Sequence, residues 1–172
     1  MSLFYSDDTI LDFERRLDYS PIIEHLENLY RTTHDTQIFV TLIASAWYYL
    51  VEGDTNRKPL NYHWEYFHSK LKYYLDIGLR DYTSDERFDY VAGYLLDLHW
   101  MYLGASYEGI GLELMRKCSE ISEDEQIKAL ALSFLKNDKL SNPETVVKTL
   151  FPSNSELDTY FSYVIGCDFQ KQ

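Results

Sequence analysis

The residues HDTQI, at positions 34 to 38, return in altered form as SDERF at 84 to 88 and as EDEQI at 123 to 127. In each copy an aspartate stands three positions before an apolar residue; the pairs are Asp35 with Ile38, Asp85 with Phe88, and Asp124 with Ile127. Aspartate is a preferred helix N-cap, because its carboxylate accepts hydrogen bonds from the unpaired amides of the first turn. Each copy is therefore expected to end one helix and to begin the next.

The helices that precede these turns share a register. Nine positions before each of the apolar turn residues stands another residue of apolar character: Leu29, Leu79 and Cys118. The copies lie 50 and then 39 residues apart, so the repeat is a degenerate one. Capping without repetition is the alternative explanation, because aspartate before an apolar residue is a common helix start.

Three helical hairpins are expected, at about 21–52, 62–103 and 107–139, followed by short helices at about 143–151 and 154–165. Pairs of residues that typically begin a helix support the later starts: Ser122 with Glu125, Asn142 with Pro143, and Ser153 with Glu156. The seven Gly and four Pro are few for 172 residues, which argues against the many tight turns of an all-β fold. We therefore predict one all-α domain over 1–172.

Tandem antiparallel hairpins cannot each bury their own apolar face, so they are expected to stack as a short, irregular α-solenoid with one concave side. The helix that follows Asp35 should be its centre, since apolar residues cover almost the whole circumference up to Gly53. Between 21 and 139 this architecture resembles tetratricopeptide-type solenoids. Neither their period of about 34 residues nor their Trp, Leu, Gly, Tyr, Ala, Phe, Pro pattern recurs.

The chain is acidic, with a formal charge of −12 from 28 Asp and Glu against 16 Lys and Arg. This charge repels nucleic acid and anionic membranes and attracts a basic partner. The simpler interpretation is that acidity keeps the protein soluble. The N-terminus resembles no secretory signal, and the longest apolar stretch, 38–51, is too short to span a bilayer. A cytoplasmic location is expected, with Cys118 and Cys167 as free thiols.

The sequence contains no Gly-rich phosphate loop, no nucleophile elbow and no calcium loop. His63 and His68 are five positions apart, about 140° around a helix, so they cannot share a metal ion in regular geometry. His99, between two apolar residues, is more simply a partly buried, hydrogen-bonded histidine. We predict a chain that is not an enzyme and needs no metal or cofactor. The alternative is that catalytic side chains converge only in space.

The chain contains 16 tyrosines, and packing in a hydrophobic core does not by itself account for so many. On the helix expected at 62–81, an inward stripe of Trp64, Phe67, Leu71 and Leu75 lies beside a second stripe of His63, Tyr66, Lys70 and Tyr73. The second stripe packs on a neighbouring hairpin or forms a binding face. Tyrosine with scattered carboxylates is typical of protein-binding surfaces. The predicted partner-binding residues are Glu24, Glu27, His63, Tyr66, Tyr73 and Asp76.

A small, acidic, aromatic-rich chain without catalytic motifs resembles bacterial immunity proteins of contact-dependent growth inhibition and related systems. That resemblance implies a tight one-to-one complex with a cognate toxin, often a basic nuclease, whose active site or substrate surface is blocked. One alternative is a tetratricopeptide-like adaptor that binds short peptides on its concave side. Another is a helical hydrolase or ligand-binding regulator, which a deep pocket with converging histidines and carboxylates would favour.

Overall fold

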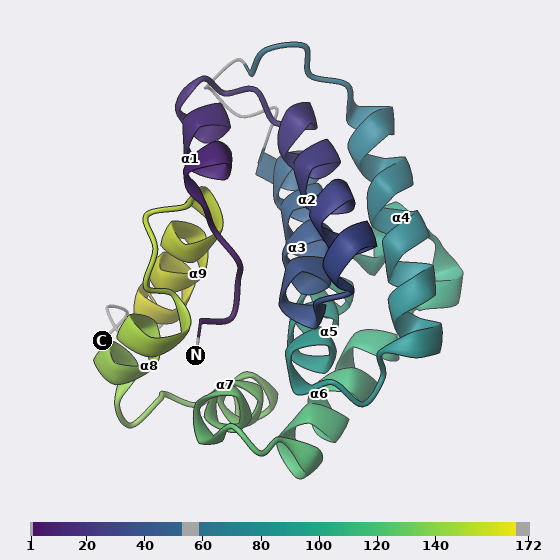
Figure 1. Ribbon diagram of the computed structural model, residues 1–172. Helices are drawn as coiled ribbons and strands as arrows, with labels where there is room; N and C mark the ends of the chain where they lie inside the picture. The colour runs from purple at the N-terminus through teal and green to yellow at the C-terminus, as the bar shows by residue number, and fades with distance from the viewer. Residues whose placement is uncertain (1, 53–58, 168–172) are drawn as a thin grey trace.

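The computed structural model describes residues 2–52 and 59–167, and within them every regular element is a helix (Figure 1). In chain order the elements are α1 (Asp8–Arg15), α2 (Ser20–Thr33), α3 (Thr36–Glu52), α4 (Trp64–Asp81), α5 (Glu86–Leu103), the 3₁₀ turn η1 (Ala105–Tyr107), α6 (Ile110–Ile121), α7 (Glu125–Lys136), α8 (Pro143–Leu150) and α9 (Glu156–Cys167). The predicted all-α class, built from successive helical hairpins, is confirmed.

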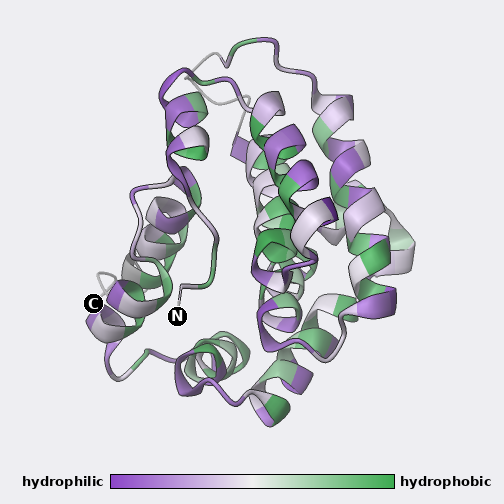
Figure 2. Ribbon diagram, viewed as in Figure 1, coloured by the Kyte–Doolittle hydropathy of each residue, from purple (hydrophilic) through white to green (hydrophobic). Residues whose placement is uncertain are grey.

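Helix α3 is the centre of the core, as its apolar circumference predicted. Residues 38–50 are all buried, because α2, α4, α5 and α9 each pack against a different part of the helix. Trp47 and Tyr49 are among the largest fully buried side chains of the described residues. Figure 2 shows α3 as mainly hydrophobic, while α2 and α4 alternate between hydrophobic and hydrophilic residues.

The three repeated turns cap helices as predicted. In each turn one carboxylate oxygen accepts two backbone amides, at 2.7 and 3.4 Å for Asp35, 3.0 and 3.2 Å for Asp85, and 2.8 and 3.2 Å for Asp124. The apolar residue three positions later is almost fully buried in every copy: Ile38, Phe88 and Ile127. One local signal therefore both begins a helix and docks it on the core.

Replacement of Asp35 by alanine is expected to lower the free energy of unfolding by about 1 kcal/mol, because the first amides of α3 lose their acceptor. Asp35 is exposed, so the change removes little packing. The control is Asp35→Asn, whose side chain also caps and should cost less than about 0.5 kcal/mol. Urea denaturation followed by circular dichroism measures both variants. Equal losses in the two would mean that Asp35 supplies its charge rather than a cap.

The third hairpin differs from its prediction in two places: the start of its first helix and the cap of its second. The 3₁₀ turn η1 occupies 105–107, so α6 begins at Ile110 rather than at 107. The expected capping box of Ser122 and Glu125 is wrong, because the buried Ser122 hydroxyl lies 3.7 Å from the sulfur of Cys118 and Asp124 caps α7 instead. Cys118 is fully buried and is a free thiol, as expected from its apolar spacing.

The predicted N-cap of α8 is confirmed, and the predicted N-cap of α9 is wrong. Asn142 accepts the amide of Thr145 at 3.4 Å, which begins α8 as predicted. At α9 the hydroxyl that accepts a first-turn amide belongs to Ser155, whose Oγ lies 3.2 Å from the Asp158 nitrogen, and not to Ser153. The sequence thus located this helix start to within two residues.

The N-terminal segment and α9 fold back onto α3 (Figure 1). The amide of Leu3 donates to the carbonyl of Leu150 at 2.7 Å, which ties the segment to the end of α8. The Phe4 ring lies 5.0 Å from that of Phe161, which in turn lies 6.3 Å from Trp47 of α3. This side of α3 is therefore covered by the N-terminal segment and α9.

Candidate functional site

The second stripe of α4 borders a surface groove between α2 and α4 with a volume of about 600 Å³. The residues that line it are Glu27, Tyr30, Arg31, Ser69, Lys70, Tyr73, Tyr74 and Ile77. Sequence reasoning named Glu27 and Tyr73 but missed Tyr30 and Tyr74. The signal for Tyr30 was its spacing of three positions from Glu27 on one helix face.

A partly buried ion pair forms the inner wall of this groove. Glu27 is only 6% exposed, and its carboxylate accepts hydrogen bonds from the ammonium group of Lys70 and from the Tyr74 hydroxyl, the latter at 2.7 Å. Burial, followed by the hydrogen bond to Glu27, raises the pKa of Tyr74, so the phenol stays a donor. The charge of Glu27, expected to face a partner, is instead used within the protein to join α2 to α4.

Tyrosine rings form the outer part of the groove. Tyr73 is 61% exposed, and its ring stands edge-on to that of Tyr74 with centroids 5.0 Å apart. Tyr66, two stripe positions earlier and outside the groove lining, is half-buried, and Lys70 Nζ lies 5.5 Å from its ring centroid. Burial raises the pKa of Tyr66 to about 12, with smaller contributions from Glu27 and Glu24. The rings are held by their neighbours and lose little freedom on binding.

The other predicted residues lie outside the groove lining. Glu24 is exposed on α2 and close enough to Tyr66 for its charge to act on the phenol. His63 is exposed at the residue before α4 and makes no capping hydrogen bond there. Asp76 accepts the hydroxyl of Tyr107 from η1, so it connects α4 to the α5–α6 turn. Of the six predicted residues, Glu27 and Tyr73 line the groove, Tyr66 and Glu24 lie beside it, and His63 and Asp76 lie apart.

Trp64, at the start of α4, differs from the predicted pattern. Trp64, expected to face inward, is 41% exposed and stacks on the ring of His68 at 4.7 Å. The His68 Nε2 atom lies 2.8 Å from the carbonyl oxygen of Tyr102, which fixes the ring against the end of α5. His99 is partly buried and accepts the Trp47 indole N–H at 3.2 Å, as predicted. Burial lowers the pKa of His99.

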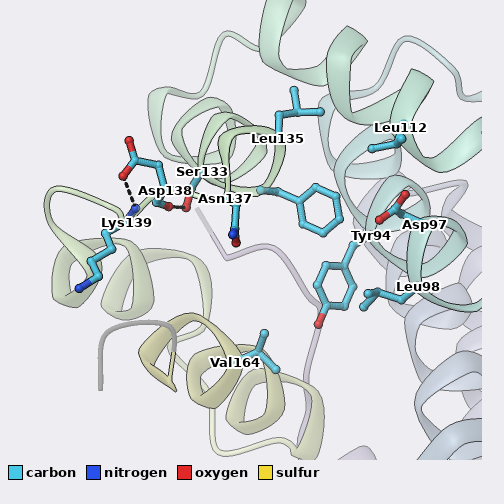
Figure 3. A pocket seen from close by; sticks show the side chains of 11 residues that line it. Tyr94, Asp97, Leu98, Leu112, Ser133, Leu135, Asn137, Asp138, Lys139 and Val164 are labelled. Atoms are coloured by element: carbon cyan, nitrogen blue, oxygen red, sulfur yellow. Dashed lines mark hydrogen bonds between the residues drawn. The ribbon is translucent and has the colours of Figure 1, made fainter. Parts of the chain in front are cut away.

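A second groove, of about 560 Å³, lies between α5, α6, α7 and α9 (Figure 3). The rings of Tyr94 and Phe134 meet at 5.9 Å on one wall. The Ser133 hydroxyl donates to the Asp138 carbonyl, and the Lys139 amide donates to the Asp138 carboxylate at 2.9 Å. These polar groups close the end of α7. Among the described residues that line the groove there is neither an imidazole nor a thiol.

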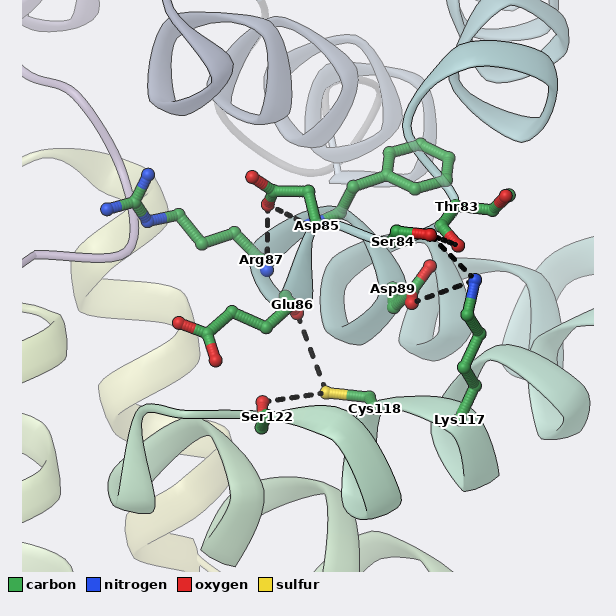
Figure 4. A network of polar contacts seen from close by, with 10 residues as sticks. Thr83, Ser84, Asp85, Glu86, Arg87, Asp89, Lys117, Cys118 and Ser122 are labelled. Carbon is green, nitrogen blue, oxygen red and sulfur yellow. Dashed lines mark hydrogen bonds and ion pairs between the residues drawn. The ribbon is translucent and has the colours of Figure 1, made fainter.

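A buried polar network joins α5 to α6 (Figure 4). Asp89 is fully buried, and the nearest cation is the ammonium of Lys117, 3.8 Å from Oδ2. Burial raises the pKa of Asp89 to about 6. The Cys118 thiol donates to the Glu86 carbonyl at 3.5 Å, and burial raises its pKa to about 12. A protonated, inaccessible thiol is a poor nucleophile, so this network supports packing rather than catalysis.

Comparison with known proteins adds no family to this description. No family model matches the chain, and neither a curated protein nor a solved structure matches it significantly.

Over 2–52 and 59–167, no three His, Cys, Asp or Glu side chains are placed to hold a metal ion together. In the same part of the chain, none of the helices combines the length and apolar character that crossing a bilayer requires.

Proposed function

We propose that this chain is a non-catalytic protein-binding protein that neutralises a basic partner in a one-to-one complex, as bacterial immunity proteins neutralise a cognate toxin. The observation that supports it is the α2–α4 groove, where an exposed Tyr73 and the packed rings of Tyr30 and Tyr74 surround a partly buried ion pair. The net charge of −12 favours a positively charged partner, such as a nuclease that binds phosphate.

Binding energy and association rate have separate sources in this proposal. Rigid aromatic side chains that enter a partner's surface supply most of the energy at protein interfaces. Surface carboxylates such as Glu24 contribute mainly to the rate of encounter, through long-range attraction that salt weakens. The proposed complex therefore forms faster at low ionic strength, while its lifetime depends on the tyrosines of the groove.

The adaptor alternative depends on an open concave face. In this chain Phe4, Phe151 and Phe161 pack together on that side, with rings 5.0 to 6.0 Å apart, and cover α3. A peptide would have to displace these core side chains before it could bind there. The outer groove between α2 and α4 is therefore the better-supported binding surface, and a folded protein domain is the better-supported ligand.

The test is a survival assay in bacteria. The protein encoded immediately upstream, or its C-terminal domain, is expressed with and without this chain in the cytoplasm. Growth only in the presence of this chain, with a salt-sensitive one-to-one complex in a pull-down, would support neutralisation. Toxicity that this chain does not relieve, or a complex with short peptides instead, would contradict the proposal.

Tyr73→Ala is expected to weaken the complex with that toxin domain at least about tenfold, because a central aromatic anchor is removed. The matched control is Met101→Ala, which truncates an equally exposed side chain, also 61% accessible, at the end of α5. Biolayer interferometry measures both dissociation constants. If the Met101 variant loses as much affinity as the Tyr73 variant, the proposed contact face is wrong.

A further inference from the structure

The α2–α4 groove is locally positive, although the chain as a whole has a formal charge of −12. The charged residues of its lining are Glu27, Lys70 and Arg31. The Lys70 ammonium pairs with the Glu27 carboxylate, so these two charges cancel. Arg31 lies one helical turn after Glu27 on α2, and its guanidinium is the charge that remains.

Arg31 has no carboxylate partner in the part of the chain that the structure describes. Over 2–52 and 59–167, none of the ion pairs includes its guanidinium. Asp35, four positions later, accepts the first amides of α3. Asp81, at the end of α4, forms two hydrogen bonds with Arg80, at 2.7 and 2.8 Å. Since arginine stays protonated at neutral pH, the groove keeps an unbalanced cation.

Arg31 acts on the interior of the groove and not only on its rim. Burial and the hydrogen bond to Glu27 raise the pKa of Tyr74, and the positive charge of Arg31 acts on this phenol in the opposite direction. The guanidinium is therefore close to the Tyr74 hydroxyl, which itself donates to Glu27 at 2.7 Å. A negatively charged group that entered the groove would meet Arg31 beside these tyrosines.

Two further hydrogen-bond donors line the groove. The Lys70 ammonium, whose side chain is 27% exposed, has three N–H groups, and Glu27 accepts one of them. Tyr73 is 61% exposed, and in the described residues its hydroxyl has no hydrogen-bond partner. The groove thus combines a guanidinium, an ammonium and a phenol as donors to one ligand.

We propose that the α2–α4 groove binds the carboxylate of an aspartate or glutamate residue of a protein partner, with Arg31 as its ion-pair partner. The planar guanidinium matches a carboxylate with two parallel hydrogen bonds. A single carboxylate balances the single unpaired charge, whereas a phosphate group would bring a charge of about −2 next to Glu27. That this groove contacts the partner rests on the proposed function. A basic partner would then present one acidic residue within a positive surface.

The experiment is a nuclear magnetic resonance titration of the full chain with the blocked tripeptide Ala-Glu-Ala, which needs no toxin. The control peptide, Ala-Gln-Ala, has nearly the same shape without the charge. With the glutamyl peptide, the Arg31 Nε–H signal and the amides of 69–77 should shift and reach saturation. The glutaminyl peptide should leave these signals unchanged.

Arg31→Gln should weaken binding of the glutamyl peptide at least about tenfold, because the charge-assisted hydrogen bonds are lost. Arg116→Gln is the matched control, since it removes the same charge from an exposed position on α6 and should bind the peptide as the unaltered chain does. Tyr73→Phe keeps the ring without the hydroxyl and should weaken binding about threefold.

Three results would each overturn the proposal: equal shifts with the glutaminyl peptide, unchanged affinity of Arg31→Gln, or an equal loss in Arg116→Gln. Inorganic phosphate that shifts the same signals at a lower concentration than the glutamyl peptide would overturn it in favour of a phosphate site. A failed survival assay with intact peptide binding would remove the toxin as partner but support the carboxylate site. Successful neutralisation without peptide binding would support the proposed function and overturn this inference.

Discussion

A Gly111→Ala variant is expected to lose about 3 kcal/mol of unfolding free energy, although alanine is the better helix former. Gly111 lies where α6 crosses α5, and a Cβ atom at this position would stand 2.3 Å from the backbone nitrogen of Asp97. It would also stand 2.8 Å from the carbonyl oxygen of Gly93. Backbone atoms cannot rotate away as a flexible side chain does, so the two helices would have to separate.

Thermal and urea denaturation measure this loss, and two other variants calibrate it. Gly93→Ala places its Cβ 3.0 Å from Cγ of Met115, which can rotate, and 3.2 Å from two backbone atoms of α6, a much milder approach than at Gly111, so a smaller loss of about 1 kcal/mol is expected. Arg116→Ala, on the exposed side of α6, should change stability by less than about 0.5 kcal/mol. Helix propensity alone would make Gly111→Ala stabilising by up to about 1 kcal/mol, so a gain would contradict the close crossing.

Local chemistry explains why the helices could be predicted from the sequence. The caps at Asp35, Asp85 and Asp124 each consist of a carboxylate and the two backbone amides two and three positions later. Residues close together in the sequence therefore determine the geometry of these caps. The Ser122 prediction failed because Ser122 ends α6: its hydroxyl lies beside Cys118, one turn earlier on the same helix, and Asp124, two positions later, caps α7.

The binding surface could be predicted only in part, because periodicity gives the faces of a helix without saying what covers them. Tyr73 was placed correctly among exposed positions of α4. Glu27 was read as an available charge, but its partner Lys70 lies 43 positions away and no local pattern indicates that pair. The return of α9 onto α3 is likewise a long-range contact.

The junction between α1 and α9 contains a buried carboxyl group. Glu14 is 6% exposed, and both of its oxygens lie 3.1 Å from the amide nitrogen of Glu156. The Tyr49 hydroxyl donates to it at 3.4 Å. Burial is the largest influence and raises the pKa of Glu14 from 4.5 to about 7, with the charges of Glu156 and Asp158 acting in the same direction.

This raised pKa makes the protein less stable as the pH increases. Below pH 4.5 Glu14 is protonated in both the folded and the unfolded chain. Between about pH 5 and 8 the unfolded chain ionises readily, while the folded chain must ionise a buried group, so stability falls through the folded pKa. The loss over that interval is about 2.5 kcal/mol for Glu14. Asp89, with its pKa raised to about 6, adds a loss in the same direction.

Glu14→Gln isolates this contribution, because glutamine resembles the protonated carboxyl and keeps an acceptor for the Glu156 amide. The unfolding free energy of the variant minus that of the unaltered chain should rise by about 2.5 kcal/mol from pH 5 to pH 8. Subtraction removes the common contributions of Asp89 and of His99, whose lowered pKa acts in the opposite sense. Glu108→Gln, which removes an exposed charge, should give a difference that barely changes with pH. A difference for Glu14→Gln as flat as that of the control would mean that Glu14 ionises at this junction without cost to stability.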